Sequence, residues 1–196
     1  MAGKKQRSSA DKWKKKKWYK VKAPKEFKEI IIGETPAEKE QQLIGRTVEL
    51  PFSEIAAQKK QIPMLVKLRI KAVSSGSAET ELIGCRFDSG YLRRIVRRRK
   101  SKVDTIIYAD TSDSKKVKLA ATAICTSKTN RKKETEIRKL MAKEITDEAK
   151  KETFENFMLQ VVSGALAQKI FNSLKKIAPL QRAEVIKAYL VEGTNK

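Results

Sequence analysis

The sequence predicts an α+β fold, in which a mainly antiparallel β-sheet or a barrel-like core precedes two long C-terminal helices. Short period-2 segments fill the first two-thirds of the chain, and apolar residues recur at helical spacing in the last third. A chain of 196 residues that is 40% hydrophobic can bury the core of one good-sized domain. We therefore expect a single domain over residues 21–191, between a basic arm (1–20) that is disordered in the free protein and a loose tail (192–196).

Short strands separated by turn residues make up the predicted sheet. The clearest pattern lies between residues 64 and 73, where Val66, Leu68 and Ile70 alternate with residues such as Lys67, the period of a half-buried strand. The chain becomes strand-like from Val21, and the segment from Phe27 to Ile32 is expected to end at Gly33. The expected strands cover residues 27–32, 43–50, 64–73, 79–87, 103–109 and 116–125, with turns at 74–77 and 110–114.

An Arg-rich helix is predicted to interrupt these strands. Asp88 or Ser89 can cap its first turn. Apolar residues then recur at helical spacing: Tyr91, Leu92, Ile95 and Val96. At 100° per residue the basic side chains form two flanks, Arg93, Arg97 and Lys100 on one and Arg94 and Arg98 on the other. Arg99 falls near the apolar edge, so we expect the helix to fray there.

Two long helices are predicted in the last third of the chain. The first is capped by Thr129 or Asn130 and runs to residue 150, and the second begins at Thr153 and is closed by Pro179. The first helix begins with three basic residues, Arg131, Lys132 and Lys133. The helix dipole disfavours cations at this end, and an external phosphate would relieve the conflict. Residues 182–191 are expected to form a final strand or a segment that faces a partner.

The charge distribution predicts an anionic partner. The chain has 45 Lys and Arg against 23 Asp and Glu, a net charge of +22 and a pI near 10.0. The first 28 residues carry twelve Lys or Arg against Asp11 and Glu26, and residues 91–102 carry seven with no acid. This excess favours a nucleic acid as the partner, with an anionic membrane surface as the competing interpretation.

The end of the basic arm combines cations with aromatic rings. Both tryptophans of the chain lie between residues 12 and 20, so lysines there can contact phosphates while rings stack on bases. The alternative is that Trp18 and Tyr19 begin the folded domain and anchor the arm. The predicted RNA-binding residues are Lys12, Trp13, Lys14, Lys15, Lys16, Lys17, Trp18, Lys20, Arg93, Arg94, Arg97, Arg98, Arg99, Lys100, Lys102, Arg131, Lys132 and Lys133.

Catalytic, metal and cofactor sites are not expected. The chain has no histidine, and its two cysteines, Cys85 and Cys125, are too few for a Cys-rich zinc site and are expected to be reduced, buried thiols. Neither a Gly-rich phosphate loop nor a catalytic group of carboxylates is evident. No apolar run approaches the roughly 20 residues that span a bilayer, and the first residues lead into charge, so secretion is not expected.

Several segments in order resemble one ribosomal protein family, the archaeal and eukaryotic small-subunit family S-three-a-e. They are KKKKWYKVKAP at 14–24, IGETPA at 32–37, IGR at 44–46, YLRRIVRRRKSKVD at 91–104, EIRKLM at 136–141 and KIAPL at 176–180. The resemblance covers nearly the whole folded chain. Residues 84–88 lack the polar, histidine-containing run of the family, and residues 126–130 differ from its Lys-Thr-Ser-Gln ending. The long C-terminal extension of eukaryotic members is also missing, so we expect the archaeal type.

The resemblance implies a non-enzymatic protein of the cytoplasmic ribosome, without cofactors. Its expected partners are small-subunit ribosomal RNA, neighbouring small-subunit proteins on the platform and, near the exit channel, messenger RNA, with no membrane. A nucleic-acid-binding regulator outside the ribosome is the alternative, although no helix-turn-helix, zinc finger or aromatic RNA-recognition motif is evident. A nuclease is disfavoured because residues 12–22 and 91–102 contain no carboxylate for a catalytic metal.

Overall fold

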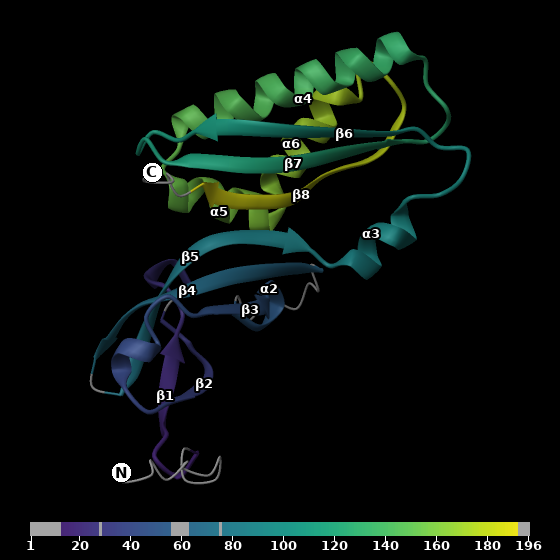
Figure 1. Cartoon of the computed structure of the whole chain (residues 1–196). Coiled ribbons are helices and arrows are strands. Elements are labelled where there is room, and N and C mark those ends of the chain that lie inside the picture. The colour runs from purple at the N-terminus through teal and green to yellow at the C-terminus, as the bar shows by residue number, and fades with distance from the viewer. Residues whose placement is uncertain (1–12, 28, 56–62, 75, 192–196) are drawn as a thin grey trace, which may run out of the picture.

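The computed structural model describes residues 13–27, 29–55, 63–74 and 76–191, which form one sheet and a layer of helices (Figure 1). The strands are β1 (Lys17–Lys22), β2 (Ile31–Ala37), β3 (Thr47–Pro51), β4 (Met64–Ser74), β5 (Ser77–Phe87), β6 (Lys102–Asp110), β7 (Lys116–Cys125) and β8 (Leu180–Val191). The α-helices are α2 (Phe52–Ile55), α3 (Ser89–Ile95), α4 (Arg131–Lys151), α5 (Phe154–Ser163) and α6 (Ala165–Leu174). Two 3₁₀ turns lie at Lys25–Phe27 and Glu40–Gln42.

Strand β5 joins the two halves of the sheet. The strand order is β2-β1-β5-β8-β7-β6. Strand β5 also pairs with β4, and β4 pairs in turn with β3. All pairings are antiparallel except the one between β1 and β5. The predicted mainly antiparallel sheet is confirmed, and the described strands form an open sheet rather than a closed barrel.

The β4–β5 hairpin follows the predicted pattern most closely. Buried and half-buried residues alternate along β4 from Met64 to Ile70, so one face of the strand contributes to the core. The strand predicted to end at Gly33 is different: β2 runs through Gly33 and Pro36. Among the described strands β2 pairs only with β1, and such an edge position tolerates a proline that has no N–H to donate.

Helices α4, α5 and α6 cover one face of β6, β7 and β8 (Figure 1). Strand β6 shows this clearly, because alternate residues from Val103 to Ala109 are buried and their neighbours are exposed. Helix α4 contributes a buried stripe, which consists of Ile137, Met141, Ile145 and Ala149. Phe154, Phe157 and Met158 of α5 belong to the same core. The opposite face of β6 therefore points away from the helices.

The second C-terminal helix predicted from Thr153 onward is in fact two helices. Gly164 ends α5 and precedes α6, with φ of 80° in the left-handed region. Glycine adopts this conformation without the steric cost that a Cβ imposes, and it commonly ends helices in this way. The apolar pattern continues across the break because both helices pack against the same core.

The sheet begins inside the segment predicted to be the basic arm. Strand β1 starts at Lys17, and Tyr19 and Val21 are buried in a small second core with Leu43 and Ile70. Residues 1–12 and 192–196, where the disordered arm and the loose tail were predicted, lie outside the described residues. No helix in the described ranges is long and apolar enough to cross a membrane.

Both cysteines are free and fully buried, as predicted. Burial raises the pKa of the Cys85 thiol to about 12. Because both thiols are fully buried, the native protein should react with a thiol reagent such as DTNB at neither cysteine at pH 8, whereas both should react in 6 M guanidinium chloride. The absorbance at 412 nm measures the extent of labelling. Rapid labelling of the native protein would contradict the burial of the two cysteines.

Candidate nucleic-acid interface

Helix α3 is fixed to the end of β5 by its cap and by one aromatic residue. The backbone N–H of Gly90 donates to the Asp88 carboxylate at 3.1 Å, so Asp88 is the capping residue. The Tyr91 ring stacks on Phe87 with centroids 5.2 Å apart. Arg182 from β8 donates to the Tyr91 hydroxyl, and burial raises the pKa of Tyr91.

The predicted Arg-rich helix is shorter than expected. Helix α3 ends at Ile95, so the two arginine flanks that we predicted along one helix do not form. The chain continues irregularly, Val96 is exposed, and Arg99 has a positive φ of 65°. Seven cations within twelve residues repel one another in a continuous helix, because like charges three or four residues apart are neighbours on its surface.

Ser101 joins this basic loop to the start of α4. The Ser101 hydroxyl donates to the Glu134 carboxylate at 2.9 Å and accepts from the Thr129 backbone N–H at 3.0 Å. The Ser101 carbonyl also accepts from the Cys125 N–H at 2.9 Å. Sequence reasoning did not identify Ser101, since a lone serine between basic residues carries no recognisable pattern.

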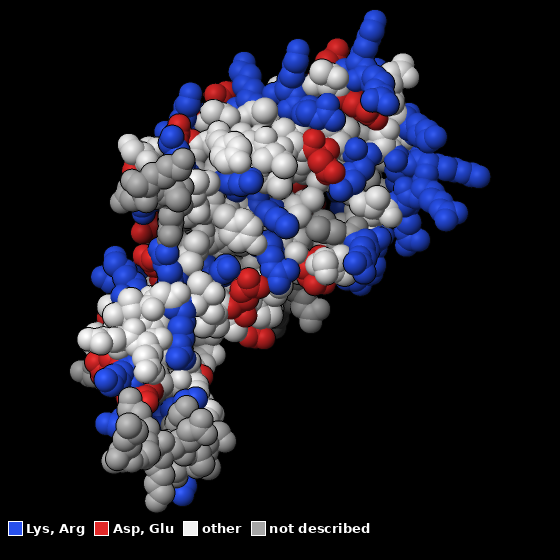
Figure 2. All heavy atoms as spheres, in the orientation of Figure 1, with Lys and Arg blue, Asp and Glu red and all other residues white. Residues whose placement is uncertain are grey.

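The loop and the start of α4 form one strongly cationic surface, which we call the basic end (Figure 2). Helix α4 begins at Arg131, with Asn130 as its N-cap residue but without a side-chain capping bond. Glu134 is the only acid in the first turn. The basic end consists of Arg93, Arg94, Arg97, Arg98, Arg99, Lys100, Lys102, Arg131, Lys132 and Lys133.

Most cations of the basic end have no acidic partner. Within the described ranges, only Lys102 of this set forms an ion pair, with Asp104 at 2.9 Å. Lys100 donates to the side-chain oxygen of Gln181 at 2.5 Å. The five arginines are exposed, and so are Arg131, Lys132 and Lys133. This surface can therefore bind several phosphates without first breaking an internal salt bridge, apart from the one at Lys102.

The arm residues lie at the other end of the molecule, far from the basic end (Figure 1). Trp13 and Trp18 are both more than half exposed and meet edge to face, with ring centroids 6.4 Å apart. The Lys16 ammonium lies 4.5 Å from the Trp13 ring centroid. Tyr19 is buried, so Tyr19 rather than Trp18 anchors this segment. Lys14, Lys15, Lys17 and Lys20 are exposed, and Lys12 lies outside the described residues.

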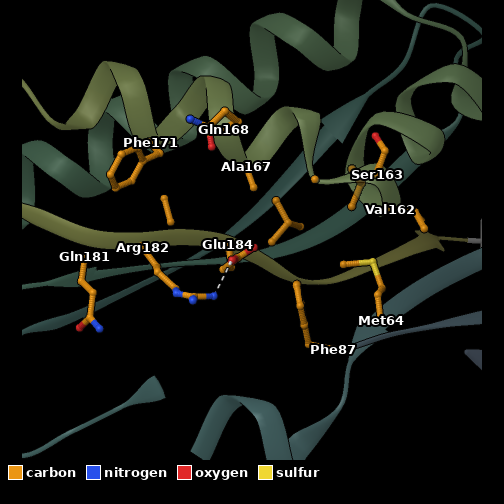
Figure 3. A pocket seen from close by; sticks show the side chains of 14 residues that line it. Met64, Phe87, Val162, Ser163, Ala167, Gln168, Phe171, Gln181, Arg182 and Glu184 are labelled. Carbon is orange, nitrogen blue, oxygen red and sulfur yellow. Dashed lines mark ion pairs between the residues drawn. The ribbon is translucent and has the colours of Figure 1, made fainter. Parts of the chain in front are cut away.

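A groove that sequence reasoning did not predict lies between β8 and the junction of α5 and α6 (Figure 3). It has a volume of about 350 Å³ and contains Glu184, whose pKa is raised by burial. Arg182 lies 4.0 Å from Glu184, and Phe171, Met64 and Phe87 supply apolar walls. The residues that line the groove include no nucleophile beside a base. Across the described ranges, no group of three His, Cys, Asp or Glu side chains is placed to bind a metal ion.

The structure therefore defines a basic protein with a cationic surface at one end and exposed lysines beside two tryptophans at the other, and its described part holds no cluster of metal-ligating side chains. Residues 4–193 match the Ribosomal S3Ae family, and the chain belongs to this family of ribosomal proteins. The family is not one of enzymes, and its members have a structural role in the ribosome.

Archaeal relatives match over nearly the full length. A protein of Saccharolobus islandicus (strain L.S.2.15 / Lassen #1) is 35% identical over 182 residues, 93% of this chain and 88% of the relative. A protein of Sulfurisphaera tokodaii is 34% identical over 183 residues, 93% of this chain and 95% of the relative. Both are named small ribosomal subunit protein eS1. The family resemblance predicted from the sequence is thus confirmed.

Proposed function

We propose that this chain is a structural constituent of the small ribosomal subunit and holds ribosomal RNA through the basic end and the Lys/Trp arm. The observation that carries the proposal is that residues 93–102 and 131–133, about 30 positions apart in the sequence, lie on one surface. Among the described residues, the cations of this surface form a single ion pair. A folded protein that gathers cations in this way is stabilised when an anion neutralises them.

The basic end suits the phosphate backbone of folded RNA. Arginine forks bind phosphate oxygens bidentately, and the exposed Arg97, Arg98 and Arg99 extend from an irregular loop that can follow a curved backbone. The first turn of α4 adds unpaired N–H groups and the positive end of the helix dipole. Double-stranded RNA hides its base edges in a deep groove, so we expect recognition through shape and phosphate contacts.

The arm and the basic end would contact different RNA elements, because they lie at opposite ends of the molecule (Figure 1). Trp13 and Trp18 expose rings that can stack on unpaired bases, while the adjacent lysines contact phosphates. From the family resemblance we further propose a position on the platform, beside neighbouring small-subunit proteins and near the channel through which messenger RNA leaves.

The test is a salt titration of RNA binding with two variants of equal charge. The first variant changes four residues to Ala: Arg93, Arg94, Arg97 and Arg98. The control variant also changes four exposed cations to Ala, all outside the basic end: Lys139, Lys143, Lys175 and Lys176. Each lost phosphate contact lowers the slope of log affinity against log salt by about 0.7–0.9, so the first variant should lose roughly 3 in slope on small-subunit RNA. The control should lose less than about 1.

Fluorescence anisotropy with purified small-subunit RNA and with generic duplex RNA measures both affinity and slope. We expect the wild type to prefer small-subunit RNA at 0.2 M salt. Equal affinity for both RNAs, with the same slope in both variants, would contradict the proposal and favour the non-ribosomal regulator.

A further inference from the structure

We propose that the uncovered face of β6, β7 and β8 is a second RNA-binding surface, which stacks unpaired bases on tyrosines and holds their phosphates with lysines. The partner is RNA, as in the proposed function, but the surface and its chemistry differ from those of the basic end. The proposal therefore succeeds or fails separately from the role of the arginines.

The face is exposed because the helices pack on the other side of the sheet (Figure 1). Along β6 the residues that point away from α4 are exposed, and Ile106 and Tyr108 are each about two-thirds exposed, at 65% and 64%. Large apolar side chains are costly to leave in water, so adjacent ones on a sheet surface indicate a binding site. In Figure 2 this face is turned to the viewer and shows a pale surface crossed by blue side chains.

Strand register places two aromatic rings on either side of a lysine. Tyr108 of β6 pairs with Lys118 of β7, which pairs with Tyr189 of β8, so the three form one row across the sheet. Neighbouring strands are about 4.8 Å apart, which separates the two tyrosines by roughly 10 Å. The Lys118 ammonium lies 5.4 Å from the Tyr108 ring centroid. Such a row offers two stacking positions with a cation between them.

The next row supplies an apolar floor and a further cation. Ile106, Ala120 and Lys187 are paired across the same three strands. With Lys118 and Tyr189 they line a groove of about 520 Å³ on this face. Tyr189 lies over Gly84 of β5, a position where a Cβ would be 2.4 Å from the tyrosine ring. Gly84 therefore lets this ring lie down on the sheet rather than stand away from it.

Unpaired lysines beside exposed aromatic rings favour single-stranded RNA as the partner of this face over a neutral protein surface. Lys116, Lys118 and Lys187 are exposed and form no ion pair with any described residue. The nearby carboxylate of Asp104 is already paired with Lys102 and accepts a hydrogen bond from Thr122. Aromatic rings beside unpaired lysines on an open sheet are the combination that binds single-stranded RNA, because every base has a face to stack.

The test uses the full chain with Trp13 and Trp18 changed to Ala, so that the arm cannot stack on bases. The probe is a fluorescein-labelled ten-nucleotide oligouridine at 0.3 M KCl, where phosphate contacts contribute less. Tyr108→Ala should weaken binding by about 5- to 150-fold, the loss expected for one stacked base, whereas Tyr108→Phe keeps the ring and should bind within about twofold of this parent chain. Tyr108 is exposed, so both variants should keep the melting temperature of the parent chain. Crosslinking with 4-thiouridine should label peptides from residues 102–118 and 187–191.

Two results would overturn the proposal. The first is equal oligouridine binding by the parent chain and by Tyr108→Ala. The proposed function would still hold after this result if the four-arginine variant lost affinity for small-subunit RNA. The other comes from a photocrosslinking amino acid at position 106 in reconstituted small subunits: an adduct with protein alone would make this face a protein interface.

Discussion

Phe157→Ala should destabilise the fold by about 3–5 kcal/mol, the loss typical of removing a buried aromatic side chain. Phe157 lies on α5 and is completely buried in the main core, together with Met158 and Val161. The rest of the core is held by the sheet and by α4 and α6, so it collapses only in part into the space that the ring leaves. Urea denaturation followed by circular dichroism measures the loss.

Tyr108→Ala is the matched control for this prediction, because it also removes an aromatic ring, but from an exposed position on the sheet. It should change the free energy of unfolding by less than about 1 kcal/mol. A loss below about 1.5 kcal/mol for Phe157→Ala would show that α5 does not belong to the cooperative core.

Gly84→Ala should cost about 3 kcal/mol, which is the upper end of the usual range for inserting a methyl group into a packed site. A Cβ at this position would lie 2.4 Å from the Tyr189 ring and 2.5 Å from the Ala188 carbonyl oxygen. The ring can rotate away, but the carbonyl belongs to the backbone of β8. The methyl group therefore pushes β8 from β5 at the point where the two halves of the sheet meet.

The junction between β5 and β8 is held by few residue pairs. Strands β5 and β8 are joined at three residue pairs: Gly84 with Tyr189, Cys85 with Ala188, and Arg86 with Lys187. Gly33→Ala is the control, because no atom lies within 4 Å of a Cβ built there. It should leave stability unchanged or raise it slightly, because it reduces the freedom of the unfolded chain. Equal melting temperatures for Gly84→Ala and the wild type would contradict the close approach of the two strands.

The sequence was informative wherever local chemistry decides the outcome. Alternation along β4 and β6 and the stripe of α4 predicted these elements, because burial on one face imposes a period that the residues display. It was misleading at Gly33 and Gly164. Whether glycine ends an element depends on neighbours distant in the sequence: Gly33 lies in an edge strand, whereas Gly164 breaks a continuous apolar pattern between two helices.

The candidate site was predictable as a list of residues, but its spatial arrangement was not. Clusters of cations stand out in a sequence, whereas their separation into two ends of the molecule follows from strand order (Figure 1). The junction of residues 93–102 with the start of α4 depends on the hydrogen bonds of Ser101. The row of Tyr108, Lys118 and Tyr189 depends on the register between β7 and β8, whose paired residues Lys118 and Tyr189 are about 70 positions apart, and no local pattern reports it.

The place of β8 in the sheet also governs when the protein can fold during its synthesis. Strand β8, which lies between β5 and β7 in the sheet, follows α4, α5 and α6 along the chain. Until residues 180–191 have left the exit tunnel, a nascent chain carries the unfilled edges of β5 and β7, which invite pairing with other chains. Contacts so distant along the chain close slowly. Completion of the sheet must therefore wait until residues 180–191 have emerged, well after β5 and β7 have been made.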